Sequence, residues 1–490
     1  MTRVAFALFA TTFAFAACGA PKPITLAPVQ PPALPPIASL RSDLEAIFAS
    51  PEFERSFWSV VVRPLASSDD LYALNAGKLM MPGSTLKVIT TAAAAERLGW
   101  SHRFETRVAT AAPIDSGVVR GDLVIIGGGD PGISERGDEP GAMRSMARQV
   151  RDAGITRIEG GIIGDDDLFD DKGTGDGWTL DNLPYGYSAP VTALMYNEGS
   201  VDLVIRAGAV AGEPVAIQVR PEDGGLQIHN SLTTVAESGA GALTLQRQAE
   251  SPRLTVHGQI PAKSPPFTRT ASVVNPTAFF AAAFRRSLID EGVQVAGDAI
   301  DIDDFASKPD LTSARPLVTR HSAPLAELAV SMMKVSQNQY AESLQKFIGG
   351  RRAVNETLQS WDIGPDSHVV VDGSGLSRYN YVTGDALVRV LQKMHTDPKH
   401  ATHFPATLPV AGREGPLAKR LAGTAAEGRI RAKTGTVDNV RSIAGYLIAA
   451  DGETLVFSII ANNFSTPNAV IDAAADKALV RLSTYSRHGR

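Results

Sequence analysis

Alternation of apolar and polar residues predicts strands near both ends of the chain. The first pair flanks a turn at Asp69-Asp70, and the last pair flanks a turn at Asp451-Gly452. The four predicted strands cover residues 59–64, 71–74, 443–448 and 454–460. A closing helix over residues 468–482 follows the last pair, so strands and helices are mixed along one chain.

A helical period of apolar residues predicts several helices between these strands. Leu44, Ile47 and Phe48 share one face of an expected N-terminal helix. The strongest helix covers residues 84–98, where a run of alanines favours it and Gly99 ends it. Further helices are predicted over residues 276–288 and 324–334.

Between residues 105 and 264 the pattern changes. Short β-like runs, such as residues 122–126 and 201–205, are separated by many glycines, and long helical periods are few. We therefore expect an inserted, mainly β region here.

Length and composition narrow the class of protein. A chain of 490 residues, 44% hydrophobic and 20% charged, can bury a large core and should form more than one compact unit. The net charge of −5 gives no basic surface of the kind that attracts nucleic acid. We therefore expect no nucleic-acid partner.

The N-terminus has the features of an export signal. Residues 1–17 combine a basic start at Arg3 with the apolar run Val4–Ala17, which ends in small residues. That run is shorter than the about 20 residues that a membrane span needs. These features predict a periplasmic protein.

Cys18, the only cysteine, stands where this segment ends. The stretch Phe15-Ala16-Ala17-Cys18 is similar to a bacterial lipobox, which predicts a lipid anchor; the alternative is an incidental thiol removed with the signal. The rest of the chain cannot form an internal disulfide in either case. Residues 18–40 are rich in proline, which predicts an extended tether.

The spacing Ser-x-x-Lys occurs three times, at Ser84/Lys87, Ser331/Lys334 and Ser343/Lys346. Residues three apart share a helix face, so a neutral lysine amine can take the proton of the serine hydroxyl. Only Ser84 follows a Pro-Gly break, which places it at a helix N-terminus, where partial positive charge favours a developing oxyanion. We therefore expect Ser84 to be a nucleophile and Lys87 its base, and the other two pairs to lie on solvated helix faces.

Ser336-Gln337-Asn338 lies just beyond the helix predicted to end at residue 334, where a loop can project side chains into a cleft. Ser336 could relay a proton between a leaving amine and a lysine, and Asn338 could hold a substrate amide through its donor and acceptor. The alternative is that Ser336 is a turn or N-cap serine.

Lys433-Thr434-Gly435 is the most specific of the three motifs and opens a strand-like segment. On a strand, Lys433 and Gly435 face the same side, and the absence of a Gly435 side chain would let a substrate backbone pair with the strand. Lys433 would add positive charge, and the hydroxyls of Thr434 and Thr436 could hold a carboxylate. The backbone N–H groups of Thr436 and Ser84 could form an oxyanion hole. The alternative is a solvated edge strand with one lysine.

The three motifs, in this order, are the signature of active-site-serine penicillin-recognising enzymes. Together with Pro82-Gly83, the loop Asp372–Arg378 and the long separation of the first two motifs, they are similar to one family in particular. The sequence resembles the D-alanyl-D-alanine carboxypeptidases/endopeptidases of peptidase family S13, which are penicillin-binding protein 4-like low-molecular-mass penicillin-binding proteins. The likeness covers essentially the whole mature chain.

The resemblance implies a mixed α/β (α+β) fold: a split transpeptidase-like, β-lactamase-like domain with an antiparallel sheet flanked by helices and with inserted, mainly β accessory domains. The expected parts are residues 41–104 and 265–490 of the split domain and residues 105–264 of the insert. The implied reaction is acylation of Ser84 by the penultimate D-Ala of a peptidoglycan stem peptide, or by a β-lactam, and then hydrolysis. No metal or organic cofactor is expected, and the oligomeric state is not predicted.

Two further site residues come from the resemblance alone. Asp165 aligns with an acidic residue that meets the diaminopimelate side chain of the peptide, and Arg378 aligns with a basic residue at the same end of the cleft. By themselves, these residues would predict a solvated turn and an ordinary surface arginine.

Other functions fit the sequence less well. Gly127–Gly132 satisfies G-x-G-x-x-G, but Pro131, Gly137 and Pro140 interrupt the helix that dinucleotide binding requires. A Ser-His-Asp hydrolase lacks its G-x-S-x-G elbow, because Gly186–Pro190 misses the last glycine. A β-lactamase and a non-catalytic cell-wall-binding lipoprotein are the remaining alternatives. No deacylating glutamate can be assigned for the first, and the intact motif residues argue against the second.

Overall fold

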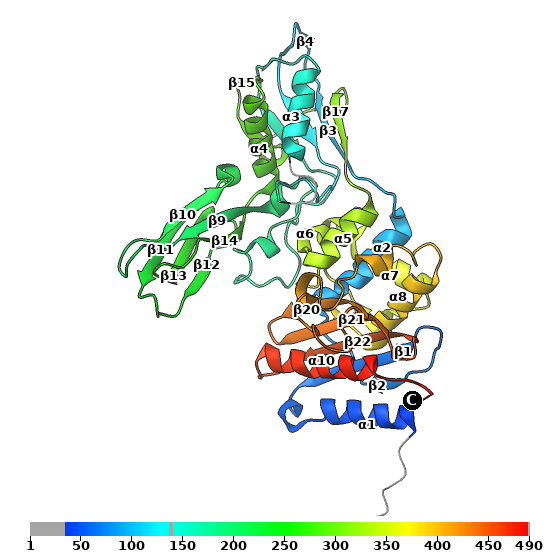
Figure 1. Ribbon diagram of the computed structural model, residues 1–490. Coiled ribbons are helices and arrows are strands. Elements are labelled where there is room, and N and C mark those ends of the chain that lie inside the picture. Colours follow the sequence, from blue (N-terminus) through cyan, green and yellow to red (C-terminus); the bar gives the residue numbers. More distant parts are fainter. Residues whose placement is uncertain (1–34, 137–140, 489–490) are drawn as a thin grey trace, which may run out of the picture. The chain divides into compact units, whose positions relative to one another are not determined.

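The computed structural model describes residues 35–136 and 141–488. One five-stranded antiparallel sheet joins the two ends of this part of the chain (Figure 1). Its order is β2 (Tyr72–Leu74), β1 (Phe57–Pro64), β22 (Thr454–Asn462), β21 (Val440–Ile448) and β20 (Ile430–Val437). The strands predicted from alternation are therefore confirmed, and early and late strands pair directly along β1 and β22.

Both faces of this sheet are covered by helices. Along β1, Val60 and Val62 pack on the side of α1 (Pro36–Phe48) and α10 (Asn468–Ser483), whereas Val61 packs on the opposite side, with α2 (Lys87–Leu98) and α8 (Gly384–Thr396). Successive strand residues point to opposite faces, so β1 is buried on both. The remaining helices of this second layer are α5 (Leu325–Val335), α6 (Asn338–Phe347), α7 (Gly350–Ser360) and the short α9 (Phe404–Thr407). This is the predicted mixed fold.

The insert folds around a core of its own. Its five-stranded sheet has the order β16 (Ala299–Asp301), β8 (Ile162–Asp165), β6 (Leu123–Ile126), β3 (Glu105–Thr110) and β17 (Arg315–His321). Two three-stranded sheets follow the orders β10 (Ala216–Arg220), β9 (Ser200–Arg206), β14 (Phe267–Ser272) and β11 (Gln227–Val235), β13 (Arg253–Pro261), β12 (Ala242–Gln246). A further sheet of the insert consists of the short strands β4 (Ile114–Asp115), β5 (Val118–Val119), β7 (Arg157–Ile158) and β15 (Gln294–Val295). Outside the insert, β18 (His368–Val369) pairs with β19 (Tyr381–Val382).

The predicted end of the insert, at residue 264, is too early. β3 pairs with β17, which lies far beyond that point, and the predicted helix α4 (Pro276–Asp290) packs in the insert core against α3 (Ala142–Asp152). The chain therefore returns to the helices that cover the first sheet after His321. Helix α3 was not expected. This helix begins at Ala142, well after the Gly127–Gly132 segment. A Cβ on Gly128 would lie 1.8 Å from the carbonyl oxygen of Glu105, so this glycine permits close backbone packing.

The predicted tether is also shorter than expected. Helix α1 already begins at Pro36, and Leu40 is fully buried against the sheet. Proline is compatible with the first turn of a helix, so the proline-rich composition misplaced this boundary. The predicted signal, Cys18 and the rest of the tether lie outside the described residues. None of the described helices combines the length and hydrophobicity needed to cross a bilayer.

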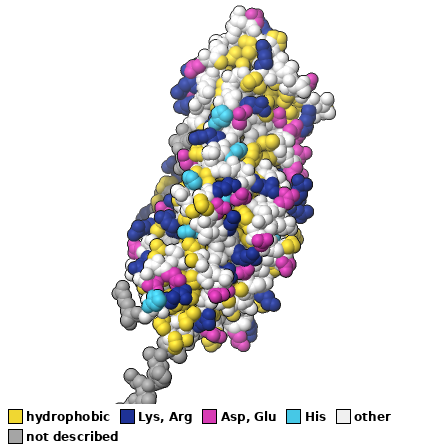
Figure 2. All heavy atoms as spheres, turned by 90° about the vertical axis from the view of Figure 1, so that its right-hand side faces the viewer, with side chains coloured by type: hydrophobic (Ala, Val, Ile, Leu, Met, Phe, Trp, Pro, Cys, Tyr) yellow, Lys and Arg dark blue, Asp and Glu magenta, His cyan; other side chains and the backbone are white. Residues whose placement is uncertain are grey.

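Charge is mixed on the surface. On the face drawn in Figure 2, basic and acidic side chains are interspersed rather than gathered by sign. This distribution agrees with the absence of a basic stripe in the sequence.

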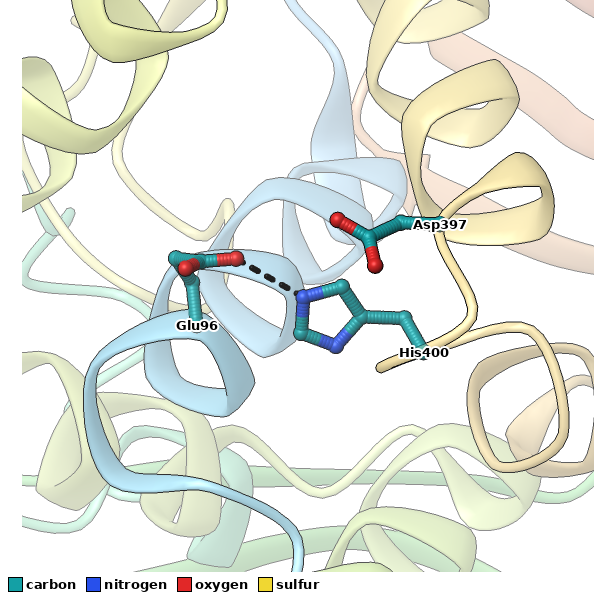
Figure 3. A group of neighbouring side chains, drawn as sticks. All are labelled: Glu96, Asp397 and His400. Atoms are coloured by element: carbon teal, nitrogen blue, oxygen red, sulfur yellow. Dashed lines mark hydrogen bonds and ion pairs between the residues drawn. The ribbon is translucent and has the colours of Figure 1, made fainter.

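A buried histidine fastens the end of α2 to the segment that follows α8. Glu96, Asp397 and His400 point toward one another, and Nε2 of His400 lies 2.8 Å from a carboxylate oxygen of Glu96 (Figure 3). The other ring nitrogen accepts a hydrogen bond from Nε1 of Trp100 at 3.2 Å. Lys399 also pairs with Glu96, at 2.8 Å. The Glu96 carboxylate therefore accepts from both Lys399 and His400.

The pairing of Glu96 should make stability depend on pH. Desolvation opposes its charged form, but hydrogen bonds from Lys399 and His400 outweigh it and lower the pKa below the usual 4.5. A carboxylate with a lowered folded pKa stabilises the fold above its unfolded pKa, and the contribution disappears as the pH falls through the folded pKa. Glu96→Gln should therefore lower the free energy of unfolding by about 0.5–1 kcal/mol near pH 7, a small effect because the carboxylate is partly exposed.

Urea unfolding at about pH 7 and at about pH 3 measures this difference, which should shrink toward zero in acid. Glu52→Gln, at an exposed glutamate, is the matched control and should change little at either pH. A difference for Glu96→Gln that stays constant or grows in acid would contradict the prediction.

Candidate active site

The turn at Pro82-Gly83 delivers Ser84 to the start of a helix. Residues Gly83–Leu86 form the 3-10 turn η2, which continues directly into α2. Gly83 has a φ of 53°, a left-handed conformation that glycine adopts with little strain. Ser84 is partly exposed, Lys87 is fully buried, and Nζ of Lys87 lies 3.0 Å from Oγ of Ser84. The structure therefore brings these two predicted residues into hydrogen-bond contact.

Lys87 has only neutral hydrogen-bond partners in the described part of the chain. Besides Ser84, its Nζ donates to Oδ1 of Asn338 at 2.7 Å and to the carbonyl oxygen of Ser374 at 2.8 Å. Burial lowers the pKa of Lys87 to about 7, although the nearby charges of Glu342 and Asp372 act in the opposite direction. An amine that is partly unprotonated at neutral pH is suited to act as a general base.

Ser336 and Asn338 stand at the junction of two helices. Ser336 follows α5 with a left-handed backbone, at a φ of 66°, and its Oγ accepts a hydrogen bond from Nζ of Lys433 at 2.7 Å. Asn338 begins α6, accepts from Lys87 and donates through Nδ2 to the carbonyl oxygen of Tyr187 at 2.7 Å. Ser336 is therefore not the N-cap of α6, and Asn338 orients the lysine, a contact that the sequence did not predict.

Lys433 lies on β20, the edge strand of the sheet. It is fully buried and donates to Ser336 and to the carbonyl oxygen of Thr434, the latter at 2.9 Å. Burial, and then repulsion from Lys87, lower the pKa of Lys433 well below its usual value. We expected this lysine to add positive charge to the cleft. Burial acts against that charge, and the contact with Ser336 gives the ammonium form of Lys433 a route for proton exchange.

Gly435 is needed for a different reason from the one predicted. A Cβ at this position would lie 2.6 Å from the carbonyl oxygen of Pro82 and 2.9 Å from the backbone nitrogen of Ser84, so η2 occupies the space. A Cβ on Gly83 would in turn lie 3.1 Å from the backbone nitrogen of Thr436. These contacts hold η2 and β20 together at the two N–H groups of the predicted oxyanion hole.

Glu342 was not identified from the sequence. It lies one turn into α6, is buried, and accepts hydrogen bonds from the backbone N–H groups of Gly373 at 3.0 Å and Ser374 at 2.8 Å. These bonds aim the carbonyl oxygen of Ser374 at Lys87. Burial, and then the charge of Asp372, raise the pKa of Glu342 to about 7. The helical spacing of Glu342 four residues after Asn338 was the signal available in the sequence.

Asp372 organises the rest of the loop Asp372–Arg378. Its carboxylate accepts from the backbone N–H groups of Gly375 at 2.8 Å and Ser377 at 2.6 Å, and from Nε1 of Trp178 at 2.9 Å. Trp178 belongs to the insert, so this acid also joins the insert to the catalytic loop. A Cβ on Gly375 would lie 1.9 Å from the carbonyl oxygen of Gly83, which shows how closely the loop packs against η2.

A cavity of about 400 Å³ opens beside Ser84. Five predicted residues line it: Ser84, Ser336, Asn338, Thr434 and Thr436. The insert contributes Asn182 and Tyr187 to the same wall, which the sequence analysis did not anticipate. The three motifs therefore converge on one solvent-accessible pocket.

The two residues suggested by resemblance alone do not line this cavity. Asp165 ends β8 in the insert, where its carboxylate accepts from the backbone N–H of Asp167 at 3.2 Å and faces Lys308. Arg378 donates to the carbonyl oxygen of Asp438 at 3.0 Å, and Asp438 is a lining residue. The geometry thus does not bring Asp165 to the pocket, whereas Arg378 contacts a residue of the pocket lining.

The lysines of the other two Ser-x-x-Lys pairs form ion pairs with acids. Lys334 pairs with Glu414 at 2.9 Å, and Lys346 pairs with Asp170. Ser343 is fully buried rather than on a solvated face as expected. The pair that follows the Pro-Gly break has a hydrogen bond between its serine and its lysine, and its serine also borders the cavity.

Two groups of described residues bring together donors of the kind that bind metal ions: Glu96, Asp397 and His400, and Asp166, Asp301 and Asp303. Lysines already pair with carboxylates in both groups, through Lys399 on Glu96 and Lys308 on Asp303. Neither group lines the cavity beside Ser84.

The fold and the site define the class of protein. A sheet covered by helices, a Ser-x-x-Lys pair at a helix start and a lysine on the facing edge strand are the arrangement of active-site-serine penicillin-recognising enzymes. Within this class, the chain belongs to the D-Ala-D-Ala carboxypeptidase 3 (S13) family, whose model matches residues 40–484. The predicted family is therefore confirmed.

Individual relatives agree with this assignment. The chain is 35% identical over 475 residues to the D-alanyl-D-alanine carboxypeptidase of Actinomadura sp. (strain R39), covering 92% of this chain and 86% of the relative. Penicillin-binding protein 4 of Haemophilus influenzae has a similar structure, with a TM-score of 0.78 and 25% identity over 92% of this chain and 99% of the other. A second structure of that protein, complexed with a novel β-lactam, has a TM-score of 0.72 at 24% identity and covers 92% of this chain and 100% of the other.

The lowered pKa of Lys87 should be visible in the rate of acylation. Because the free amine is the form that accepts a proton, the rate should rise with pH and level off above the pKa of about 7. The measurement is the second-order rate of labelling by a fluorescent penicillin between about pH 5.5 and 8.5. A rate that is flat over this range, or that falls as the pH rises through 7, would show that Lys87 is not the titrating base.

Proposed function

We propose that this protein is a serine DD-peptidase that hydrolyses D-Ala-D-Ala ends or cross-links of peptidoglycan stem peptides and is acylated by β-lactams. The contact between Ser84 and Lys87 carries this proposal, because a buried lysine with only neutral hydrogen-bond partners among the described residues can activate the serine as a nucleophile. Membership of the S13 family and the β-lactam complex of a structural relative support the choice of substrate.

In the acylation step, Lys87 takes the proton of the Ser84 hydroxyl, and Oγ attacks the carbonyl carbon of the penultimate D-Ala. The developing oxyanion is stabilised by the backbone N–H groups of Ser84 and Thr436, which η2 and β20 hold together. The bond to the leaving amine then breaks, and an ester forms on Ser84.

The leaving amine needs a proton. Ser336 lines the cavity and accepts a hydrogen bond from Lys433, so it can pass its proton to the amine and recover one from the ammonium form of Lys433. In the hydrolysis step, water attacks the ester, the water proton returns through Ser336 to Lys433, and Lys87 gives its proton back to Oγ of Ser84 as the peptide leaves.

The substrate is held along β20. As an edge strand, β20 can pair with an extended peptide, and Thr434 and Thr436 line the pocket where a terminal carboxylate would lie. The hydroxyl of Thr436 also accepts a hydrogen bond from Arg441. Asn338 lines the cavity and would lie beside the substrate, with its oxygen accepting from Lys87 and one N–H donated to Tyr187. Arg378 supports the wall at Asp438, and contact of Asp165 with the diaminopimelate side chain has no support from the geometry.

The alternatives are less well supported. Among the described lining residues, Asp438 is the one that bears a carboxylate, so the pocket presents no glutamate to activate a deacylating water. This favours a peptidase over an efficient β-lactamase. A role limited to binding the cell wall would not require the contact between the buried amine of Lys87 and the partly exposed Ser84.

Ser84→Ala tests the nucleophile. It should abolish covalent labelling by a fluorescent penicillin and reduce release of free D-Ala from a pentapeptide muropeptide by about a thousandfold or more. Liquid chromatography of muropeptides separates the two activities, since free D-Ala indicates carboxypeptidase and cleaved dimers indicate endopeptidase. Ser331→Ala, in the second Ser-x-x-Lys pair, is the control and should retain activity. Labelling that persists in Ser84→Ala would refute the proposal.

We also propose that residues 1–17 direct export to the periplasm and that Cys18 carries a lipid anchor, on the basis of the apolar run and the lipobox-like sequence alone. Cell fractionation with and without Cys18→Ser tests this. The unchanged protein should sediment with membranes and be released by detergent, whereas Cys18→Ser should become soluble in the periplasm. Identical fractionation of the two proteins would show that Cys18 is not an anchor.

A further inference from the structure

A second cavity, here called the insert cavity, adjoins the catalytic cavity. Its volume is about 900 Å³, and Asn182 and Tyr187 line both cavities. Their shared wall is fixed to the catalytic helix α6, because Asn338 donates to the carbonyl oxygen of Tyr187 at 2.7 Å and Gln339 donates to that of Gly186 at 3.0 Å. The two cavities are therefore neighbours that share this wall.

One side of the insert cavity is the edge of a sheet. Strand β12 pairs only with β13, and its residues Thr244, Leu245 and Gln246 line the cavity. The backbone N–H of Leu245 points away from β13 and makes only a long hydrogen bond, at 3.4 Å, to the hydroxyl of Tyr185. A free strand edge of this kind pairs readily with an extended peptide. The amides of Gln227 and Gln246 beside it can match further peptide groups.

The insert cavity also has an excess of positive charge. Arg247 and Arg253 line it, and neither forms an ion pair with any residue that the structure describes. Arg247 is half-buried and donates to the carbonyl oxygens of Leu183 at 3.0 Å and Ser272 at 2.5 Å, whereas Arg253 is exposed at the rim. Asp181 is the one acid among the described lining residues. A ligand carboxylate would supply the missing negative charge.

We propose that the insert cavity binds the second peptide stem of a cross-linked substrate, with the stem along the edge of β12 and a stem carboxylate facing Arg253 and Arg247. This inference rests on the proposed DD-peptidase function and adds the place where the other half of the cross-link lies. A peptide stem uses both the strand edge and the charge. A saccharide would use neither, and the rings of Tyr185 and Tyr187 already stack on each other, with centroids 5.5 Å apart.

The test compares three substrates: an uncross-linked pentapeptide muropeptide, a cross-linked muropeptide dimer, and the same dimer after enzymatic removal of its sugars. Arg253→Gln should lower kcat/KM for both dimers about fivefold, mainly through KM, because a charge-assisted hydrogen bond at an exposed rim is lost. It should leave the pentapeptide reaction and labelling by penicillin unchanged. Arg253→Lys should restore most of the loss.

Arg269→Gln is the matched control, since Arg269 is an exposed arginine on neighbouring β14 that does not line the cavity. Four outcomes would overturn the inference. Arg253→Gln could cleave the dimers fully, lose activity equally on all three substrates, or lose it only on the dimer that keeps its sugars, which would place a saccharide in the cavity. The unchanged enzyme could also act on the pentapeptide but on neither dimer. An unchanged protein that cleaves none of the substrates and is not labelled by penicillin would instead refute the proposed function itself.

Discussion

The site depends on an amine that is buried without an acid at hydrogen-bond distance. Two carboxylates, Glu342 and Asp372, are close enough to influence Lys87, but their hydrogen bonds go to other groups: Glu342 accepts from backbone N–H groups, and Asp372 accepts from backbone N–H groups and from Nε1 of Trp178. Had either reached Nζ, the result would be a buried ion pair with a firmly protonated lysine. Because the carboxylates act only at a distance, desolvation dominates and leaves Lys87 near the point where it can exchange protons at neutral pH. The surrounding loop and helices are arranged to keep that balance.

Close backbone packing makes this arrangement possible. At Gly375 and Gly435 a side chain would collide with a neighbouring backbone, and at Gly83 it would make a tight contact in a left-handed conformation, so η2 is held between the loop that follows β18 and the edge strand β20. Packing of this kind leaves little room for adjustment, since protein interiors are dense and respond to single added atoms. The same constraint that positions Ser84 therefore limits which residues can stand at these three positions.

Local patterns predicted the parts of the fold that depend on near neighbours. The strands around Asp451-Gly452 and the helix after Ser84 follow from alternation, turns and capping, and the structure has them where expected. The end of the insert was missed because it depends on the pairing of β3 with β17, which no local pattern encodes. Glu342 was missed because an acid on an amphipathic helix is ordinarily solvated. For Gly435, the need for glycine was evident from the strand, but what fills the space could be known only from the fold.

The insert and the base share a single side-chain amide. Asn338 turns its oxygen toward Lys87 and its nitrogen toward the backbone of Tyr187, so one rotamer satisfies both contacts. Rotating that amide to suit one neighbour would break its bond with the other. The insert is in this sense energetically coupled to the catalytic centre, although it supplies no reacting group. A molecule that binds between the insert and α6 and displaces Asn338 would therefore inhibit the enzyme without contacting Ser84.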